Sequence, residues 1–247
     1  MLGIIVALPE EKNTLGKAKE YSREIVQLSD QSLIAVSGAG PENARKAAML
    51  LLDQGITALL SWGCAAALDG ALQPGDLIIP ERLQSTSGEW HSTDPSWHNR
   101  LVEHLSSHIK VHDGAIVESE RLVTTASEKF RLFHSEKAIA VDMESFALAR
   151  LANETKLPFL SIRAIADPAS MPLPQSVIHA MNSKGSVELS VLLKNLVRKP
   201  SEVTALIRLG LHFRAAQRTL KHVRRLAPTL CCPQEASFAA TASSPNI

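Results

Sequence analysis

The sequence predicts one α/β domain in which helices cover both faces of a central sheet. Strand-like apolar segments alternate with helical patterns from residue 3 to residue 167, which is typical of a layered α/β domain. The apolar segment 157–167 shows no regular polar alternation, so it is expected to be a central strand buried on both faces. The chain has 247 residues, enough for one sizeable domain and a tail.

The N-terminal part is expected to contain three strands and one helix. The first apolar segment is read as a strand and not as a signal peptide, because it is short and acidic residues follow it at once. Pro41 begins the helix, since proline favours the first helical position. In order, these elements are strands at 3–8 and 32–36, a helix at 41–54, and a strand at 57–62 that ends in the small residues 63–67.

The middle of the chain adds strands, a helix and a long loop. Pro74 and Gly75 mark a turn before a strand. Residues 84–100 are polar and rich in Ser, Trp and His, which predicts an irregular loop that forms a lid. The other elements expected are strands at 76–80, 114–123 and 138–141, a helix at 145–152 and the buried strand at 157–167.

The organisation changes after the buried strand. We expect a catalytic domain over residues 1–188, a basic amphipathic helical extension over 189–226 and a disordered tail of small and polar residues over 227–247. Residues 1–190 carry a net charge of −6 and residues 191–247 carry +7. An anionic partner is therefore expected for the C-terminal segment alone.

Hydropathy and cysteine content predict a cytoplasmic protein. The chain has no run of about 18 apolar residues, so no segment is expected to span a membrane. Its three cysteines, Cys64, Cys231 and Cys232, are too few for a disulfide framework, and their odd number also argues against one. This cysteine usage favours a reducing compartment.

Two carboxylates and an arginine are expected around the buried strand. Arg163 lies inside it, and because a buried guanidinium needs a carboxylate partner, we expect it to lean toward Glu144. Asp167 ends the strand, where α/β sheets bind ligands, and a period of two places it on the same face as Arg163. The structural alternatives are a helix N-cap role for Asp167 and a counterion role for Glu144.

Small residues and acids follow the other strands. Ser37–Gly40 precedes a helix, so an anion could approach its backbone N–H groups; a tight turn is the alternative. At Gly63–Ala67 the alternative is close strand–helix contact, and Cys64 is expected to be a small buried thiol and not a nucleophile. Glu11, next to Glu10, lies either in the site or only in the first turn of a helix.

The order of these segments resembles the purine nucleoside phosphorylase and nucleosidase superfamily, which includes methylthioadenosine/S-adenosylhomocysteine nucleosidase. The matching motifs, within residues 3–170, are GIIVALPEE, SGAGPENARKAA, WGCAAALDGALQPGDLIIP, VDMESFALARLA and LPFLSIRAIADPAS. The resemblance implies a three-layer phosphorylase/hydrolase-like fold with a central mixed sheet and a basic C-terminal helical segment. It also implies a homo-oligomeric enzyme that uses neither a metal nor an organic cofactor.

The family's residue roles carry over to the matching positions. Asp167 matches the acid that meets N7 and the 6-amino group of the purine. Glu144 matches the carboxylate that holds the ribose hydroxyls, and Glu11 matches the residue that activates water in the nucleosidases. Arg163 matches the arginine that supports the acidic pair, and Met143 matches the side chain that contacts the sugar.

The remaining carried-over positions concern the substrate pocket and phosphate. Gly63, Cys64 and Leu8 are expected to line the pocket, with Cys64 in place of the nucleosidases' serine. Ser61 stands where some phosphorylases have a phosphate-binding arginine. Gly38, Gly40 and Arg45 are therefore the candidates for binding phosphate.

Further along the chain, ADPASMPLPQSVI and the basic helical segment after it resemble the hopanoid-associated phosphorylases. Those enzymes are linked with removal of adenine from adenosylhopane. This implies phosphorolytic release of adenine from a lipid-linked nucleoside, with inorganic phosphate as co-substrate. The alternatives are a hydrolytic nucleosidase for methylthioadenosine or S-adenosylhomocysteine, and a non-catalytic purine-binding or membrane-adaptor protein.

The residue types fit cleavage of an N-glycosidic bond. The departing base gains negative charge, which an acid at N7 neutralises, and such help is worth about 10²–10⁴ in rate. For Asp167 to be protonated near pH 7, its pKa must rise by about 3 from an ordinary value of about 3.9. Burial can supply part of that rise.

The C-terminal segment has three readings. Apolar and basic residues over 201–226 follow helical spacing side by side, which is typical of an amphipathic helix. The helix docks on the body or a sister subunit, or it lies on an anionic membrane surface at the inner membrane face. Nucleic-acid binding is the third reading and is not expected, because an aromatic content of 4% leaves few side chains to stack on bases.

Overall fold

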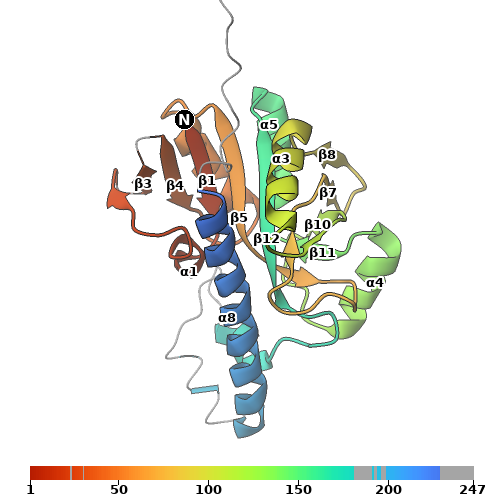
Figure 1. The fold of residues 1–247 in the computed structure, drawn as a ribbon. Helices are drawn as coiled ribbons and strands as arrows, with labels where there is room; N and C mark the ends of the chain where they lie inside the picture. The colour runs from red at the N-terminus through yellow and green to blue at the C-terminus, as the bar shows by residue number, and fades with distance from the viewer. Residues whose placement is uncertain (23, 30, 181–190, 192–193, 196–198, 229–247) are drawn as a thin grey trace, which may run out of the picture.

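A twelve-stranded mixed sheet forms the centre of the molecule (Figure 1). The computed structural model describes residues 1–22, 24–29, 31–180, 191, 194–195 and 199–228. The strands are β1 (Leu2–Val6), β2 (Lys19–Glu20), β3 (Ile25–Ser29), β4 (Ser32–Val36), β5 (Ala58–Ala67), β6 (Leu77–Ile78), β7 (Arg82–Ser85), β8 (Trp90–Ser92), β9 (Val111–His112), β10 (Ile116–Glu118), β11 (Ala140–Asp142) and β12 (Phe159–Asp167). They run in the order β2-β3-β4-β1-β5-β11-β10-β7-β8, while β12 pairs with β5 and β6, and β9 pairs with β6.

Helices cover both faces of this sheet, as predicted. They are α1 (Pro9–Lys12), α2 (Pro41–Leu52), α3 (Pro95–Ser106), α4 (Ala126–Glu136), α5 (Ser145–Thr155), α6 (Gln175–Ala180) and α8 (Val203–Leu226), with a 3₁₀ turn at Pro200–Glu202. Residues of α2 and α5 share one buried cluster with Ile5 and Ile165, and residues of α3 and α8 share another with Ile4 and Ile162. Side chains alternate across each strand, so the two clusters lie on opposite faces of the sheet. The predicted three-layer α/β fold is thereby confirmed.

The parallel pair of β5 and β12 lies at the centre of the sheet. All nine residues of β12 are buried, as the segment 157–167 predicts. β5 is longer than expected, because the small residues Gly63–Ala67 continue the strand instead of following it. A bulge between Ile165 and Asp167 shifts the pairing, so that Asp167 lies opposite Ala66.

The prediction of an irregular loop over residues 84–100 is wrong. β7 and β8 form an antiparallel pair there, and α3 begins at Pro95. The Asp94 side chain caps α3 by accepting a hydrogen bond from the backbone N–H of Trp97 at 2.7 Å. Trp97 and Leu101 are buried, so α3 is anchored in the core, whereas residues 86–89 between β7 and β8 are exposed.

The long helix α8 is packed against the sheet through its central and C-terminal turns. Its buried residues Ala216, Leu220 and Val223 join the cluster that contains Trp62. Thr219 Oγ1 donates a hydrogen bond to the backbone oxygen of Gly75 at 2.6 Å.

The predicted domain boundary at 188/189 and most of the predicted disordered tail lie outside the described residues. Within the described residues, no helix has both the length and the apolar character needed to span a membrane.

Candidate active site

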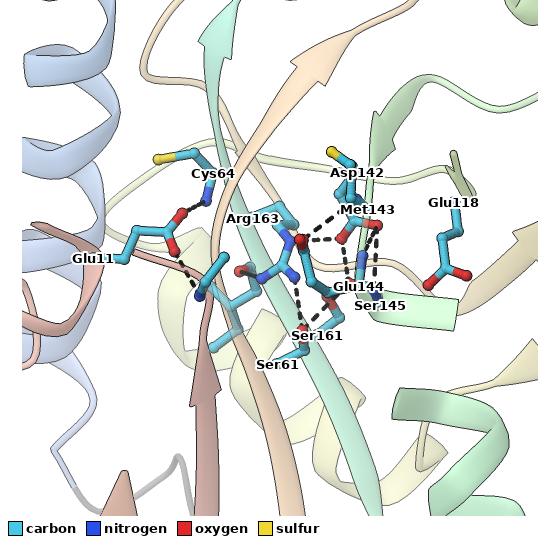
Figure 2. A network of polar contacts seen from close by, with 12 residues as sticks. Glu11, Ser61, Cys64, Glu118, Asp142, Met143, Glu144, Ser145, Ser161 and Arg163 are labelled. Carbon is cyan, nitrogen blue, oxygen red and sulfur yellow. Dashed lines mark hydrogen bonds and ion pairs between the residues drawn. The ribbon is translucent and has the colours of Figure 1, made fainter. Parts of the chain in front are cut away.

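Arg163, in the middle of β12, is the centre of a buried polar network (Figure 2). Its Nε donates to Asp142 Oδ2 at 2.7 Å, and its Nη2 donates to Ser61 Oγ at 2.7 Å. Nη1 donates to the backbone oxygen of Ile162 at 3.2 Å. The guanidinium therefore has a carboxylate partner, as predicted. The prediction that this partner is Glu144 is wrong, because Asp142 forms the ion pair with Arg163.

Asp142, at the end of β11, was missed by the sequence analysis. Its Oδ1 accepts hydrogen bonds from the backbone N–H groups of Glu144 and Ser145, and its Oδ2 accepts one from Ser145 Oγ. Ser145 Oγ also lies 2.9 Å from Ser161 Oγ. A buried ion pair is tolerated when its remaining donors and acceptors are satisfied in this way. The signal was present in VDMES, where an acid stands two residues before Glu144.

Glu11 lies close to Arg163, at the carboxyl end of β1. Its Oε2 accepts hydrogen bonds from the backbone N–H groups of Ala7 and Leu8, each at 3.0 Å. Its Oε1 accepts one from the N–H of Cys64 at 2.8 Å. Burial raises the pKa of Glu11, while the charge of Arg163 and these three N–H groups oppose the rise. Glu11 is thus a buried carboxylate held in place by three backbone N–H groups.

Gly63 and Cys64 shape the wall around Glu11. A Cβ added at Gly63 would lie 2.6 Å from Glu11 Oε1, so only glycine leaves room for this carboxylate. Burial, followed by the charge of Glu11, raises the pKa of the Cys64 thiol well above its usual value. Because only a thiolate is a strong nucleophile, this raised pKa agrees with the expectation that Cys64 is not a nucleophile. The residue is half-buried, however, and not fully buried as expected.

Glu144 joins the same cluster from the turn between β11 and α5. Its Oε1 accepts a hydrogen bond from the backbone N–H of Gly40 at 2.8 Å. Its Oε2 accepts one from the N–H of Met143 at 3.3 Å. Burial, and then the neighbouring charge of Asp142, raise the pKa of Glu144 to about 7. Glu144 and Glu11 influence each other electrostatically, so segments from β1–α1 and β11–α5 meet here.

The carboxylates around Arg163 determine its charge state. Burial alone would lower the pKa of Arg163, but Asp142, Glu144 and Glu11 outweigh burial and raise it. The guanidinium therefore stays charged and holds the acidic cluster together.

Asp167 lies four residues beyond Arg163 on β12, past the bulge. The bulge interrupts the regular alternation of side chains between the two faces of the strand. The prediction that Asp167 and Arg163 share a face, which assumed that alternation, therefore no longer follows. Asp167 Oδ2 instead lies 2.7 Å from Nζ of Lys129, a buried lysine of α4 that the sequence analysis missed. Burial raises the pKa of Asp167, and the charge of Lys129 opposes that rise.

The residues expected to bind phosphate are engaged elsewhere. The N–H of Gly38 donates to the backbone oxygen of Ala7, and the N–H of Gly40 donates to Glu144. Arg45 Nη1 pairs with Glu154 at 3.0 Å on the outside of α2 and α5. The structure therefore gives no support to Gly38, Gly40 and Arg45 as a phosphate clamp.

A separate cavity lies near the opposite end of β12. It has a volume of about 530 Å³ and is lined by residues of β8, the C-terminal part of α5 and Phe159. None of the predicted site residues lines it. Ligands of α/β sheets bind at the carboxyl ends of strands, where Glu11, Glu144 and Asp167 lie, so this cavity is not the candidate site.

Comparisons with known proteins agree with the fold. The family model of the Phosphorylase superfamily matches residues 2–198. The 5'-methylthioadenosine/S-adenosylhomocysteine nucleosidase of Staphylococcus aureus (strain JH9) is 26% identical over 231 residues, which cover 80% of this chain and 99% of that protein.

Solved structures share the architecture. Futalosine hydrolase of Helicobacter pylori has a TM-score of 0.68 at 18% identity and covers 91% of this chain and 95% of its own. The 5'-methylthioadenosine/S-adenosylhomocysteine nucleosidase of Neisseria meningitidis, in complex with methylthio-immucillin-A, has a TM-score of 0.69 at 19% identity and covers 92% of this chain and 97% of its own. At these identities the likeness shows the fold, while the family match extends over most of the chain. The chain therefore belongs to the phosphorylase superfamily and is an enzyme of the nucleoside phosphorylase and nucleosidase class.

Proposed function

We propose that this enzyme cleaves the N-glycosidic bond of an adenine nucleoside and releases adenine. The observation that carries the proposal is the cluster of Glu11, Glu144 and Arg163, with Asp167 at the end of the same central strand. The names of its nucleosidase relatives support adenine as the base.

The three carboxylates have different surroundings, and we assign each of them a different role. Glu144, whose pKa of about 7 lets it ionise near neutral pH, accepts hydrogen bonds from the ribose hydroxyls. Glu11 takes a proton from the attacking nucleophile, because it is buried and its pKa is raised. Asp167 gives a proton to N7 of the departing base, and that proton neutralises the negative charge that develops there.

Water is the nucleophile that the charges favour. The guanidinium of Arg163 is paired with Asp142 at 2.7 Å, and the acidic residues Glu11 and Glu144 also lie near it, so it is not available to hold a phosphate. The backbone N–H groups of Gly38 and Gly40 are already engaged. We therefore propose hydrolysis in place of the phosphorolysis that the resemblance to the hopanoid-associated enzymes implies.

The test is adenine release from methylthioadenosine and from adenosylhopane, each with and without inorganic phosphate. We expect release without phosphate and a free sugar as product. Strict dependence on phosphate, with a sugar 1-phosphate as product, would contradict hydrolysis but not the cleavage itself. No adenine from either nucleoside would contradict the proposed function.

A second candidate function differs in its substrate, a lipid-linked adenine nucleoside. The exposed side of α8 favours this substrate. One stripe along the helix carries three exposed apolar residues and then four exposed basic ones: Val203, Ile207, Leu211, Arg214, Arg218, Lys221 and Arg225. Spacings of three or four residues place them on one line. Such a stripe suits contact with an anionic membrane, which would give access to a lipid-linked adenine nucleoside such as adenosylhopane.

Flotation with anionic vesicles of phosphatidylglycerol and phosphatidylcholine tests the membrane contact. The full chain must be used, because Leu220 and Val223 of α8 belong to the core. We expect the double variant Arg218→Gln/Arg225→Gln to bind at least about tenfold more weakly, since each basic residue near the surface contributes about 1 kcal/mol. Arg131→Gln on α4, combined with Lys137→Gln just after α4, is the matched control and should float like the wild type. Equal flotation of both variants would exclude α8 as the membrane contact.

A further inference from the structure

A lysine that no part of the proposed mechanism uses is buried against Asp167. Lys129 lies in the first turns of α4, and its side chain is 0% exposed. Its Nζ lies 2.7 Å from Asp167 Oδ2 and donates to the backbone oxygens of Pro168 and Met171, each at 2.9 Å. The lysine therefore joins α4, the end of β12 and the segment that follows β12.

The three contacts indicate that Lys129 is an ammonium ion. A neutral amine has two N–H donors, whereas an ammonium has three. Three oxygen acceptors lie within 2.9 Å of Nζ, so only the charged form satisfies all of them. Burial lowers the pKa of Lys129, but the charge of Asp167 and the hydrogen bond to it act in the opposite direction.

The two oxygens of Asp167 have different surroundings. Oδ2 accepts from Lys129, whereas Oδ1 is buried and has no hydrogen-bond partner among the described residues. A buried polar oxygen without a partner is costly unless a ligand completes it. Oδ1 is therefore the oxygen left for the purine.

We propose that Lys129 is a positioning residue that acts through Asp167. It holds Oδ2, so that Oδ1 carries the proton and faces N7 of the base. As the glycosidic bond breaks, its electron pair moves to the base, the Oδ1–H bond breaks and an N7–H bond forms. Asp167 is left as a carboxylate, which the ammonium beside it stabilises. Lys129 thus makes Asp167 a stronger acid at the moment the base departs.

A second titratable group among the described residues acts on Asp167. His212 of α8 lowers the pKa of Asp167 through its charge, and it ranks below Lys129 in this effect. His212 remains in place in every variant proposed below, so any change between variants reports on Lys129.

The proposal rests on the proposed function, and the pH profile of adenine release tests it. Activity that needs protonated Asp167 falls as the pH rises through the pKa of Asp167. Removal of the ammonium lets that pKa rise, so the alkaline limb of kcat should move to higher pH. We expect Lys129→Gln to shift this limb by about one pH unit and to lower the plateau about tenfold.

Further variants separate positioning from structural support. Lys129→Gln keeps N–H donors for the Pro168 and Met171 oxygens, and Lys129→Met removes them as well. Lys129→Arg keeps the charge and should keep the wild-type limb. Arg131→Met, an exposed cation of the same helix, is the matched control. With 4-nitrophenyl riboside, whose leaving group departs without a proton, Lys129→Gln should change kcat little.

The outcomes distinguish the two proposals. A shifted limb in Lys129→Gln, restored by Lys129→Arg, supports the positioning role. A limb that stays at the wild-type pH, whether or not the rate falls, overturns that role and leaves Lys129 as structural support. A wild-type enzyme that releases no adenine contradicts the proposed function itself.

Discussion

At the scale of single residues, Asp167 is the group that decides how the base leaves. Lys129 holds one of its oxygens, and the other is buried without a hydrogen-bond partner among the described residues. Asp167→Asn keeps the shape of the side chain but has no acidic proton to give. We expect kcat for adenine release to fall by about 10²–10⁴ while circular dichroism shows an unchanged fold. Near-normal turnover would remove the acid role from Asp167.

Glu118 makes stability depend on pH. Burial is the main cause that raises the pKa of this β10 residue to about 8 from an ordinary 4.5, although Ala147 N–H donates to it at 2.8 Å. Between these two pH values the folded state binds a proton that the unfolded state releases, so stability falls as the pH rises.

Glu118→Gln, which has no charge to acquire, should therefore unfold at a higher temperature than the wild type at pH 8 and show less difference at pH 5. Thermal unfolding at both pH values measures this. An equal difference at the two pH values would contradict the pKa assignment.

The site residues that the sequence reveals are those that break an apolar pattern. Arg163 and Asp167 stand out because charges in a buried strand require partners. Lys129 does not stand out, because α4 is rich in polar residues and a lysine there looks solvated. Its partners Asp167, Pro168 and Met171 lie about 40 residues later in the sequence, so the local pattern does not reveal them. Asp142 was hidden by its neighbour Glu144, which could have served Arg163 equally well by spacing.

At the scale of elements, α8 contributes to the core and also presents an exposed stripe. Leu220 is fully buried against the sheet, whereas Leu211 on the same helix is 57% exposed. Leu220→Ala should lower the free energy of unfolding by about 2–5 kcal/mol, because it leaves a cavity. Leu211→Ala, the matched control, should change it by no more than about 0.5 kcal/mol. Chemical denaturation measures both, and equal losses would contradict the docked position of α8.

Elements with a clear apolar period were predicted well, and those with mixed composition were not. β1, β4, α2 and β12 lie close to their predicted ranges. The segment 84–100 was misread because its Ser, Trp and His residues hide a short hairpin and the start of α3. The sequence Asp94-Pro95 is typical of the start of a helix. It predicts α3 only together with the burial of Trp97 and Leu101, which the sequence alone does not show.

At the scale of the whole molecule, the site exists because segments far apart in the sequence converge on the central strands of the sheet. Parallel pairing of β1, β5 and β12 brings Glu11, Gly63 and Arg163 together, which the sequence order allows one to expect. The antiparallel pairing of β11 with β5 brings Asp142 and Glu144 to the same place. That reversal depends on tertiary contacts, so no local pattern could predict it.

The family resemblance also predicts a homo-oligomer, and the surface of α2 is a place to test it. Met49 and Leu50 are adjacent on this helix and are 50% and 37% exposed. Burial of each such side chain in an interface would contribute about 1.5–3 kcal/mol. We expect sedimentation equilibrium to give a multiple of the 26.7 kDa chain mass for the wild type and a smaller species for Met49→Lys/Leu50→Lys. Ile207→Lys, an exposed apolar position on α8, is the control. A wild-type mass of one chain would contradict the oligomer, and an unchanged mass in the double variant would place the interface away from α2.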